Sequence, residues 1–220
     1  MNFKQLPIFI PALLVLNLVF LSCDDTGVLY RATGDYFPLK KGTNWQYFDG
    51  NDTIVAAVVD DTIIYGYRCI LVYRGAQAEF WQKDKAEIRK LVEKKVNRAG
   101  YDFLLETQFR LYFSLPLIMN NSWHEVYSDT LDIYGDTITI KHIIRGKVVS
   151  IEDIVVPAGR FTDVYQIALV DSLQLNDSLA IQSIQYWLAH EVGIIKQRLI
   201  ATDTLEQVLI QFVSPDLTIP

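Results

Sequence analysis

The sequence contains only two cysteines, Cys23 and Cys69, among its 220 residues. A framework of several disulfides is therefore excluded. Cys69 lies in a run of β-branched and aromatic residues, and we expect it to be a small buried hydrophobic residue. Basic residues are also few, with 20 Lys and Arg against 26 Asp and Glu and a formal net charge of −6. We expect no nucleic-acid partner, because phosphate binding needs a basic patch.

Recognisable catalytic and metal-binding motifs are absent as well. None of the three histidines has a second histidine, a cysteine or a carboxylate at the spacing of a zinc site. The sequence has no G-x-S-x-G nucleophile elbow, P-loop or glycine-rich dinucleotide fingerprint. Asp129, Asp132 and Asp136 cluster, but their spacing differs from that of an EF-hand. We therefore predict no metal, no cofactor and no enzymatic activity.

Residues 1–22 have the layout of a secretory signal peptide, in which Lys4 precedes a charge-free apolar run. The following Leu21-Ser22-Cys23 resembles the lipobox of bacterial lipoproteins, with Phe20 at the position where leucine is usual. This resemblance implies that Cys23 is acylated and becomes the first residue of the mature protein. A plain cleaved signal and a membrane-spanning helix are the alternatives.

The leader also predicts where the protein is found. Several acyl chains on Cys23 would attach it to a membrane of the bacterial cell envelope, since each buried CH₂ contributes about 0.8 kcal/mol. Asp24-Asp25 follows the anchor as a candidate sorting signal, and the sequence leaves open the inner membrane, the outer membrane and the cell surface. We expect residues 23–35 to form the anchor and tether, and residues 36–220 to form a single antiparallel β domain.

The rest of the sequence is typical of an all-β protein. Half of its residues are apolar, and it contains 12 Tyr, 11 Phe and 4 Trp, which pack well on pleated sheets. Residues 181–200 predict a hairpin whose turn, Ala189–Gly193, uses Gly193 at positive φ. Apolar residues alternate with polar ones from Thr137 to Val148, which predicts a half-buried strand. We expect a strongly curved antiparallel sheet or half-barrel.

Several boundaries are predicted from turn residues. Thr53–Val59 and Thr62–Tyr73 are predicted strands, separated by a turn at Asp60-Asp61. Ser128–Asp136 is predicted to hold turns around a short strand, and Asp171–Asp177 a polar loop. Residues 84–99 fit a helix with a capping box or a long strand, and the surrounding β pattern favours the strand.

Two segments about 80 residues apart resemble each other. Pro38-Leu39 precedes Trp45, and Pro116-Leu117 precedes Trp123, at the same spacing and each before a predicted strand. We interpret both tryptophans as covers for the open end of a sheet, in preference to a pair of sugar-stacking platforms. His142 lies in the apolar register of its strand, which favours a hydrogen-bonded core histidine. The speculative ligand-binding set contains these three side chains together with Tyr186 and Trp187.

Three phrases carry a resemblance to a family. They are YFPLKKGTNW at residues 36–45, VPAGRF at residues 156–161 and YWLAHEVGIIK at residues 186–196. The chain resembles secreted bacterial lipoproteins that carry these phrases, although His190-Glu191 departs from their usual small turn residues. The resemblance implies a curved antiparallel sheet similar in outline to the lipoprotein-localisation carriers of the outer membrane. It implies no activity and no site residues.

The predicted function is that of a lipid-anchored, non-catalytic envelope protein. The concave face of its sheet would hold an apolar ligand or a segment of a partner protein. The alternative is a surface glycan-binding module that uses exposed Trp and Tyr side chains. A hydrolase of unknown type is the third hypothesis, and it would need a histidine and a carboxylate within hydrogen-bond reach in a cleft.

Overall fold

The computed structural model describes residues 34–201, 204–215 and 218–219, so the predicted leader and Cys23 lie outside the described part. Every regular element within it is a β-strand. The strands are β1 (Asn44–Phe48), β2 (Thr53–Ile64), β3 (Tyr67–Arg74), β4 (Gln77–Lys83), β5 (Glu87–Arg98), β6 (Tyr101–Ser114), β7 (Ser122–Ile133), β8 (Asp136–Val156), β9 (Gly159–Leu175), β10 (Ser178–Ala189), β11 (Gly193–Ile200), β12 (Leu205–Val213) and β13 (Thr218–Ile219).

All strands join one antiparallel sheet in the order β6-β5-β4-β3-β2-β1-β12-β11-β10-β9-β8-β7, and β13 pairs with β12. Strands β1 to β6 form one six-stranded meander and strands β7 to β12 form another. The pairing of β1 with β12 joins the two meanders. Strands β6 and β7 are consecutive in the sequence but form opposite edges of the sheet.

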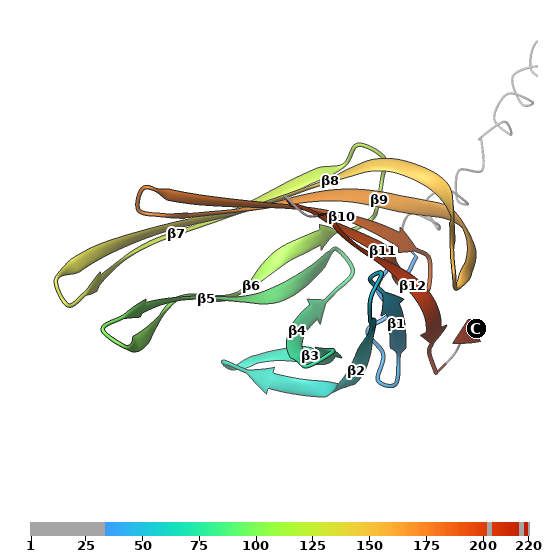
Figure 1. The fold of residues 1–220 in the computed structure, drawn as a ribbon, viewed down its shortest axis with the longest axis horizontal. Helices are drawn as coiled ribbons and strands as arrows, with labels where there is room; N and C mark the ends of the chain where they lie inside the picture. Colours follow the sequence, from blue (N-terminus) through green and yellow to red (C-terminus); the bar gives the residue numbers. More distant parts are fainter. Residues whose placement is uncertain (1–33, 202–203, 216–217, 220) are drawn as a thin grey trace, which may run out of the picture. The chain divides into compact units, whose positions relative to one another are not determined.

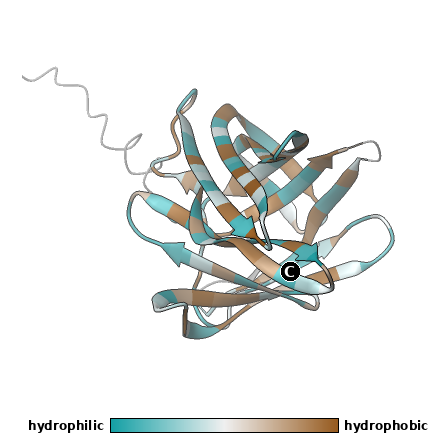
Figure 2. Cartoon of the chain, turned by 90° about the vertical axis from the view of Figure 1, so that its left-hand side faces the viewer, coloured by the Kyte–Doolittle hydropathy of each residue, from teal (hydrophilic) through white to brown (hydrophobic). Residues whose placement is uncertain are grey.

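The sheet is strongly curved, as predicted (Figure 1). Register shifts interrupt several strand pairs, including two within the 21-residue β8, and such bulges bend a strand and increase its twist. Hydrophobic and hydrophilic residues alternate along many strands (Figure 2), so each strand has one face for the interior and one for solvent. The curvature brings β6 and β7 against each other, where the Tyr127 hydroxyl donates to the Leu105 carbonyl at 3.0 Å.

The similarity between the two Trp-containing segments is a repeated structural device. Gly42 and Asn120 both have positive φ, of 90° and 66°. Each donates its N–H to a valine carbonyl in the second strand of its meander, β2 for Gly42 and β8 for Asn120. That valine then donates back to the residue after the turn, Thr43 in one meander and Asn121 in the other.

Each tryptophan is the second residue of its strand and is buried. It lies opposite a small residue of the neighbouring strand, Ala56 for Trp45 and Gly146 for Trp123. A Cβ on Gly146 would lie 2.1 Å from the Trp123 ring, so the second indole packs directly on the backbone. Both tryptophans therefore pack, at the start of a strand, against a small residue of the neighbouring strand.

The interior is filled by side chains, in two clusters. The larger one is centred on aromatic residues from both meanders, including Trp45, Tyr47, Phe113, Tyr186 and Phe212. The smaller one joins the far ends of the hairpins and is made of Leu105, Ile133, Ile138 and Ile140. Cys69 is a free, buried cysteine, as expected.

The helix alternative for residues 84–99 is wrong, because β5 occupies residues 87–98 of this segment. Lys90 and Lys94 interrupt its apolar face, which argues against a strand when only the sequence is considered. In the structure Lys90 pairs with Glu79 at 2.6 Å, and Lys94 lies opposite Glu106 of β6. A carboxylate of the neighbouring strand therefore pairs with Lys90, and the position opposite Lys94 is also acidic. In the described part no helix has the length and apolar character needed to cross a membrane.

The turn predicted at Asp60-Asp61 is also wrong. Strand β2 continues through both residues with a register shift, and Asp60 pairs with Lys41 in solvent. The hairpin turns instead at Tyr65-Gly66, where φ values of 51° and 81° match the two positive φ angles of a type I′ turn.

Two further predicted irregular segments are shorter than expected. Strand β7 runs to Ile133 and β9 runs to Leu175, so most of Ser128–Asp136 and of Asp171–Asp177 is strand. Polar side chains occur there because the long hairpins project into solvent at their ends. The predicted hairpin of residues 181–200 is confirmed as part of β10 and β11, with Gly193 at φ 91°.

Candidate functional site

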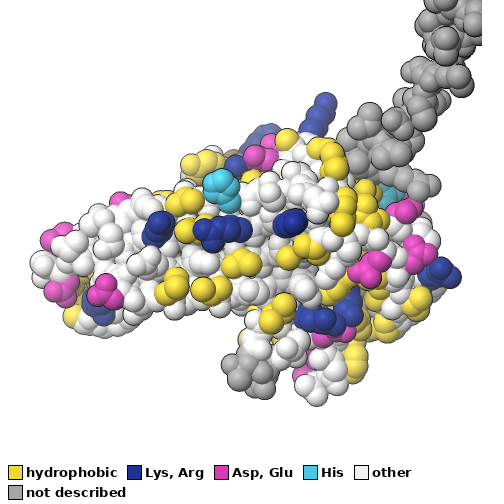
Figure 3. Space-filling model, turned by 90° about the horizontal axis from the view of Figure 1, so that it is seen from above, with side chains coloured by type: hydrophobic (Ala, Val, Ile, Leu, Met, Phe, Trp, Pro, Cys, Tyr) yellow, Lys and Arg dark blue, Asp and Glu magenta, His cyan; other side chains and the backbone are white. Residues whose placement is uncertain are grey.

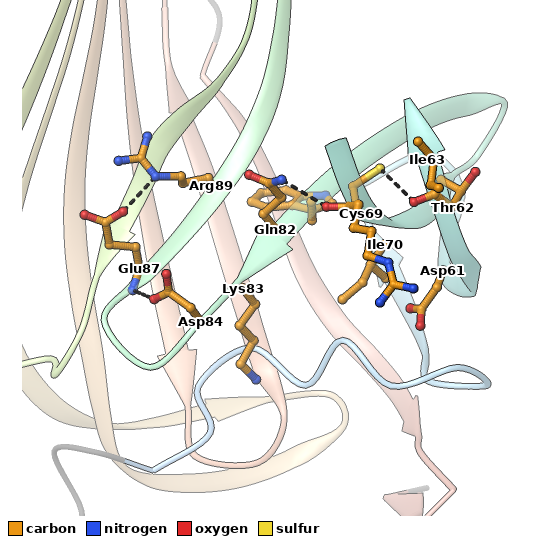
Figure 4. A pocket seen from close by; sticks show the side chains of 12 residues that line it. Asp61, Thr62, Ile63, Cys69, Ile70, Gln82, Lys83, Asp84, Glu87 and Arg89 are labelled. Atoms are coloured by element: carbon orange, nitrogen blue, oxygen red, sulfur yellow. Dashed lines mark hydrogen bonds and ion pairs between the residues drawn. The ribbon is translucent and has the colours of Figure 1, made fainter. Parts of the chain in front are cut away.

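The candidate site is a pair of adjoining cavities beside β3, β4 and the chain that leads into β1. The first has a volume of about 650 Å³ and is shown in Figure 4. The second has a volume of about 790 Å³ and reaches Gly34, Lys40 and Leu115. Both cavities are lined by Ile70, Lys83 and Asp84, which places them next to each other.

The first cavity exists because two strands diverge. Strands β3 and β4 are paired only from Ile70–Arg74 to Gln77–Trp81. Beyond Trp81, β4 pairs only with β5, and the start of β3 is left without a backbone partner from β4. The Gln82 side chain partly fills the gap, since its amide donates to the Arg68 carbonyl at 2.9 Å.

The lining of the first cavity combines apolar walls with charges of both signs. Ile63, Ile70 and the buried Trp81 supply apolar surface. Burial raises the pKa of the Cys69 thiol, which therefore stays neutral and adds to this surface. The charged lining residues are Asp61, Arg68, Lys83, Asp84, Glu87 and Arg89. Such a lining suits an amphipathic ligand or peptide segment.

Salt bridges hold several of the charged groups in place. Lys83 bridges the cavity to the incoming chain, because its ammonium donates to Asp35 at 2.5 Å and to the Phe37 carbonyl at 2.9 Å. Arg89 donates to Glu87 at 2.7 Å and to Glu125 of β7 at 2.9 Å. The cavity wall is thereby connected to the edge of the opposite meander.

A buried charged network lies elsewhere, where β6 faces β7 and β8. His142 has no exposed surface, and its Nδ1 and Nε2 lie 2.6 Å from Glu106 and 2.7 Å from Asp171. The guanidinium of Arg110 donates to the carbonyls of Glu125 and His142 at 3.1 and 3.2 Å. Side chains therefore join the two edge strands where no backbone ladder exists.

The charges of this network set its protonation state. Burial alone would lower the pKa of His142, but the hydrogen bonds and charges of Asp171 and Glu106 outweigh this effect and raise it. For Asp171, burial alone would raise the pKa, and the contact with His142 holds it below its ordinary value instead. The favoured form is an imidazolium between two carboxylates.

This arrangement predicts a pH dependence of stability. The folded-state pKa of His142 is raised, so its contribution is complete below the unfolded pKa of about 6.5 and is lost as the pH rises through the folded pKa. We expect the free energy of unfolding, measured by urea titration, to fall over this range. His142→Asn should remove the decline, while His124→Asn, at an exposed position of β7, should keep it. An unchanged decline in His142→Asn would contradict the assignment.

The five residues of the predicted ligand-binding set lie outside the lining of the two cavities. Trp45, Trp123, His142, Tyr186 and Trp187 are all buried, and none of them lines either cavity. The indole N–H of Trp187 donates to Glu152 at 3.0 Å. The Nζ of Lys196 and the Cζ of Arg198 lie 5.1 and 5.6 Å from the centre of the Trp187 ring and cover it. In the described part of the chain, these five side chains are packed against other groups of the protein.

The geometry bears on the two alternative functions. All four tryptophans are buried, so none offers the exposed ring that sugar stacking requires, whereas several tyrosines, including Tyr101 and Tyr134, are exposed. His142 does have carboxylates within hydrogen-bond reach, as a hydrolase would need. However, both of its ring nitrogens are engaged and neither cavity reaches it. Among the described residues no group of three His, Cys, Asp or Glu side chains is placed to hold a metal ion.

The sequence analysis did not identify the residues that line the cavities or those that form the buried charged network. Ile63 and Lys83 are ordinary strand residues, and no local motif indicates that β3 and β4 separate beside them. Glu106 and Arg110 gave one weak signal, which is a pair of opposite charges four residues apart in a strand rich in apolar residues. A buried partner for His142 was predicted, but its identity was not.

The chain was compared with known proteins. No protein-family profile and no curated protein sequence matches it. A candidate lipoprotein from Parabacteroides distasonis has a similar crystal structure, with 12% identity, 82% of this chain and 99% of that chain covered, and a TM-score of 0.48. A candidate exported protein with a YmcC-like fold from Bacteroides fragilis has 11% identity, coverage of 82% and 100%, and a TM-score of 0.44.

The hypothetical lipoprotein YmcC from Escherichia coli is also similar, with 11% identity, coverage of 97% and 98%, and a TM-score of 0.33. The chain is thus distantly similar in structure to candidate bacterial lipoproteins and exported proteins of the YmcC-like fold.

Proposed function

We propose that this protein is a lipid-anchored, non-catalytic binding protein of the bacterial cell envelope. Its ligand is an apolar or amphipathic molecule, or a segment of a partner protein. The observation that carries this proposal is the pair of adjoining cavities, whose lining combines apolar side chains with charges of both signs. The signal-like leader ending at Cys23 supports the envelope location.

The binding position differs from the one that the strand pattern suggested. The larger aromatic cluster packs the interior between the two meanders. The open volume lies instead where β3 and β4 diverge and where the chain enters β1. On the side of β3 that faces β4, the residues before Ile70 have no partner strand, although the Arg68 carbonyl accepts from Gln82, and a bound peptide would add hydrogen bonds along this edge.

Site-specific photocrosslinking in the producing cell tests the proposal. A photoreactive amino acid at Ile63, which lines the first cavity and is 67% exposed, should give a discrete product that mass spectrometry identifies. The same group at Tyr134, which is 73% exposed and lies in the turn of the β7–β8 hairpin, should not give this product. Thr62→Trp narrows the cavity, and the yield should fall about tenfold, the effect of losing roughly 1.4 kcal/mol of binding free energy.

Two results would count against a binding cavity. One is the same set of products from both positions, because random collision would then explain the crosslinks. The other is a yield at Ile63 that Thr62→Trp leaves unchanged while the protein remains folded. Mass spectrometry of the purified protein tests the anchor separately, since an unmodified Cys23 would contradict it.

A further inference from the structure

The outer surface of β7 to β10 has a composition that is unusual for an acidic protein. Lys141, Arg145 and Lys147 are exposed and alternate along β8 with buried residues, so all three point away from the interior. No carboxylate of the described residues pairs with them. We call this surface the basic outer face. Figure 3 shows Lys and Arg side chains in a row along the middle of this side of the molecule.

Aliphatic side chains accompany these cations. Val126 lies opposite Ile143, which lies opposite Ser172, and Ser172 lies opposite Ile181, so the four residues form one row across four strands. Val126 is 50% exposed and Ile181 is 62% exposed. The row crosses the line of cations between Lys141 and Arg145.

The carboxylates of the same strand segments are turned away. In residues 122–130, 139–149, 166–174 and 179–187 the acidic residues are Glu125, Asp129 and Asp171. Glu125 and Asp171 take part in the buried network, and Asp129 lies opposite the buried Ile140. Figure 3 shows no Asp or Glu side chain between the Lys and Arg side chains of the row.

We propose that the basic outer face docks on an anionic lipid bilayer. Cations attract the negative headgroups, and exposed aliphatic side chains gain by entering the boundary between headgroups and acyl chains. A hydrated acidic glycan would pair with the cations, but it would offer no apolar environment to the exposed aliphatic side chains of the row. The proposal rests on the membrane attachment proposed above and adds an orientation to it, in which the cavities on β3 and β4 are not part of the lipid-facing surface.

The length of the segment after Cys23 limits how far the anchor can lie from the body. Cys23 is 11 positions before the first described residue, Gly34. A segment of that length spans at most about 40 Å when it is fully extended.

The test uses the full mature chain, reconstituted in nanodiscs of phosphatidylcholine with or without about one-third phosphatidylglycerol. A fluorophore at Ile181→Cys reports the basic outer face, and one at Tyr65→Cys, in the exposed β2–β3 turn, is the control. Cys69→Ala removes the free thiol from both proteins. Nitroxide-labelled lipids should quench the fluorophore at position 181 in the anionic discs, and should quench the one at position 65 weakly.

Charge reversal provides the second arm. K141E/R145E/K147E should lower the docked-to-undocked ratio by at least about a hundredfold, because each cation near an anionic surface contributes a factor of about five and the new carboxylates are repelled in addition. K85E/K95E/R98E changes the net charge equally at exposed positions on and beside β5, and it should leave the quenching unchanged.

Three results would overturn the docking proposal. They are equal quenching at both positions, equal quenching in discs without phosphatidylglycerol, and protection of position 181 by a soluble acidic polysaccharide with no quenching by lipid. Release of the chain from both kinds of disc would instead contradict the anchor. Sedimentation of the released chain with anionic vesicles would then test the basic outer face alone, and failure to sediment would overturn it.

Discussion

Replacing Arg110 with leucine is expected to lower the free energy of unfolding by about 3–5 kcal/mol, the usual cost of breaking a buried ion pair by removing one partner. Arg110 is 1% exposed, and its Nε lies 3.6 Å from Glu106 and 3.3 Å from Glu125. Its guanidinium also satisfies two backbone carbonyls at the junction of β6, β7 and β8. Leucine would leave these acceptors unpaired and the negative charge uncompensated. Urea-induced unfolding followed by far-UV circular dichroism measures the loss.

Two matched variants make the Arg110 experiment specific. Arg160→Leu removes an exposed arginine that pairs with Asp153, and we expect a change within about 0.5 kcal/mol. Adding Glu106→Gln to Arg110→Leu should recover part of the lost stability, because it removes the excess buried negative charge. A loss below about 1 kcal/mol in Arg110→Leu would contradict the view that this network holds the edge strands together.

Replacing Trp45 with alanine is expected to cost about 3–5 kcal/mol, as for other large buried aromatic side chains. The Trp45 ring lies 5.9 Å from that of Phe212 and is nearly parallel to that of Phe37. Its indole N–H donates to the Val192 carbonyl at 2.6 Å and so holds the turn before β11. Alanine would open a cavity where the two meanders meet and would leave that carbonyl without its donor.

Variants of the same strand separate packing from hydrogen bonding in the Trp45 experiment. Trp45→Phe keeps most of the apolar area but loses the indole donor, so its cost should be about 1–3 kcal/mol. Phe48→Ala, at a position of β1 that is 40% exposed, should cost less than Trp45→Ala. Thermal and urea unfolding of the three variants give the comparison. If Trp45→Ala were as stable as the wild type, Trp45 would not belong to the core, and a ligand-binding role would become the better hypothesis.

Local patterns identified much of the architecture because they report which face of a strand is buried. The alternation around His142 placed that histidine in the interior, and the residues of the β10–β11 turn placed the hairpin correctly. The repeated spacing of Pro38 to Trp45 and of Pro116 to Trp123 marked the beginning of each meander. Such signals are local in the sequence and need no knowledge of neighbouring strands.

The ends of the strands were predicted less well, because turn-forming residues also occur within long exposed strands. Asp60-Asp61 is tolerated in β2 because a register shift and solvent accommodate it, with Lys41 as a partner. Lys90 and Lys94 looked incompatible with a strand until Glu79 and Glu106 appeared on neighbouring strands. Only the pairing of strands supplies such partners.

The sequence by itself determined that this protein is an antiparallel β protein behind a signal-like leader, because alternation and turn chemistry are properties of neighbouring residues. The tertiary structure decided where the sites lie. His142 and Asp171 lie on the paired strands β8 and β9, whereas Glu106 of β6 reaches His142 only because the sheet curves until its edges face each other. The cavity beside Ile70 likewise arises from the divergence of two strands, which depends on the curvature and register of the whole sheet.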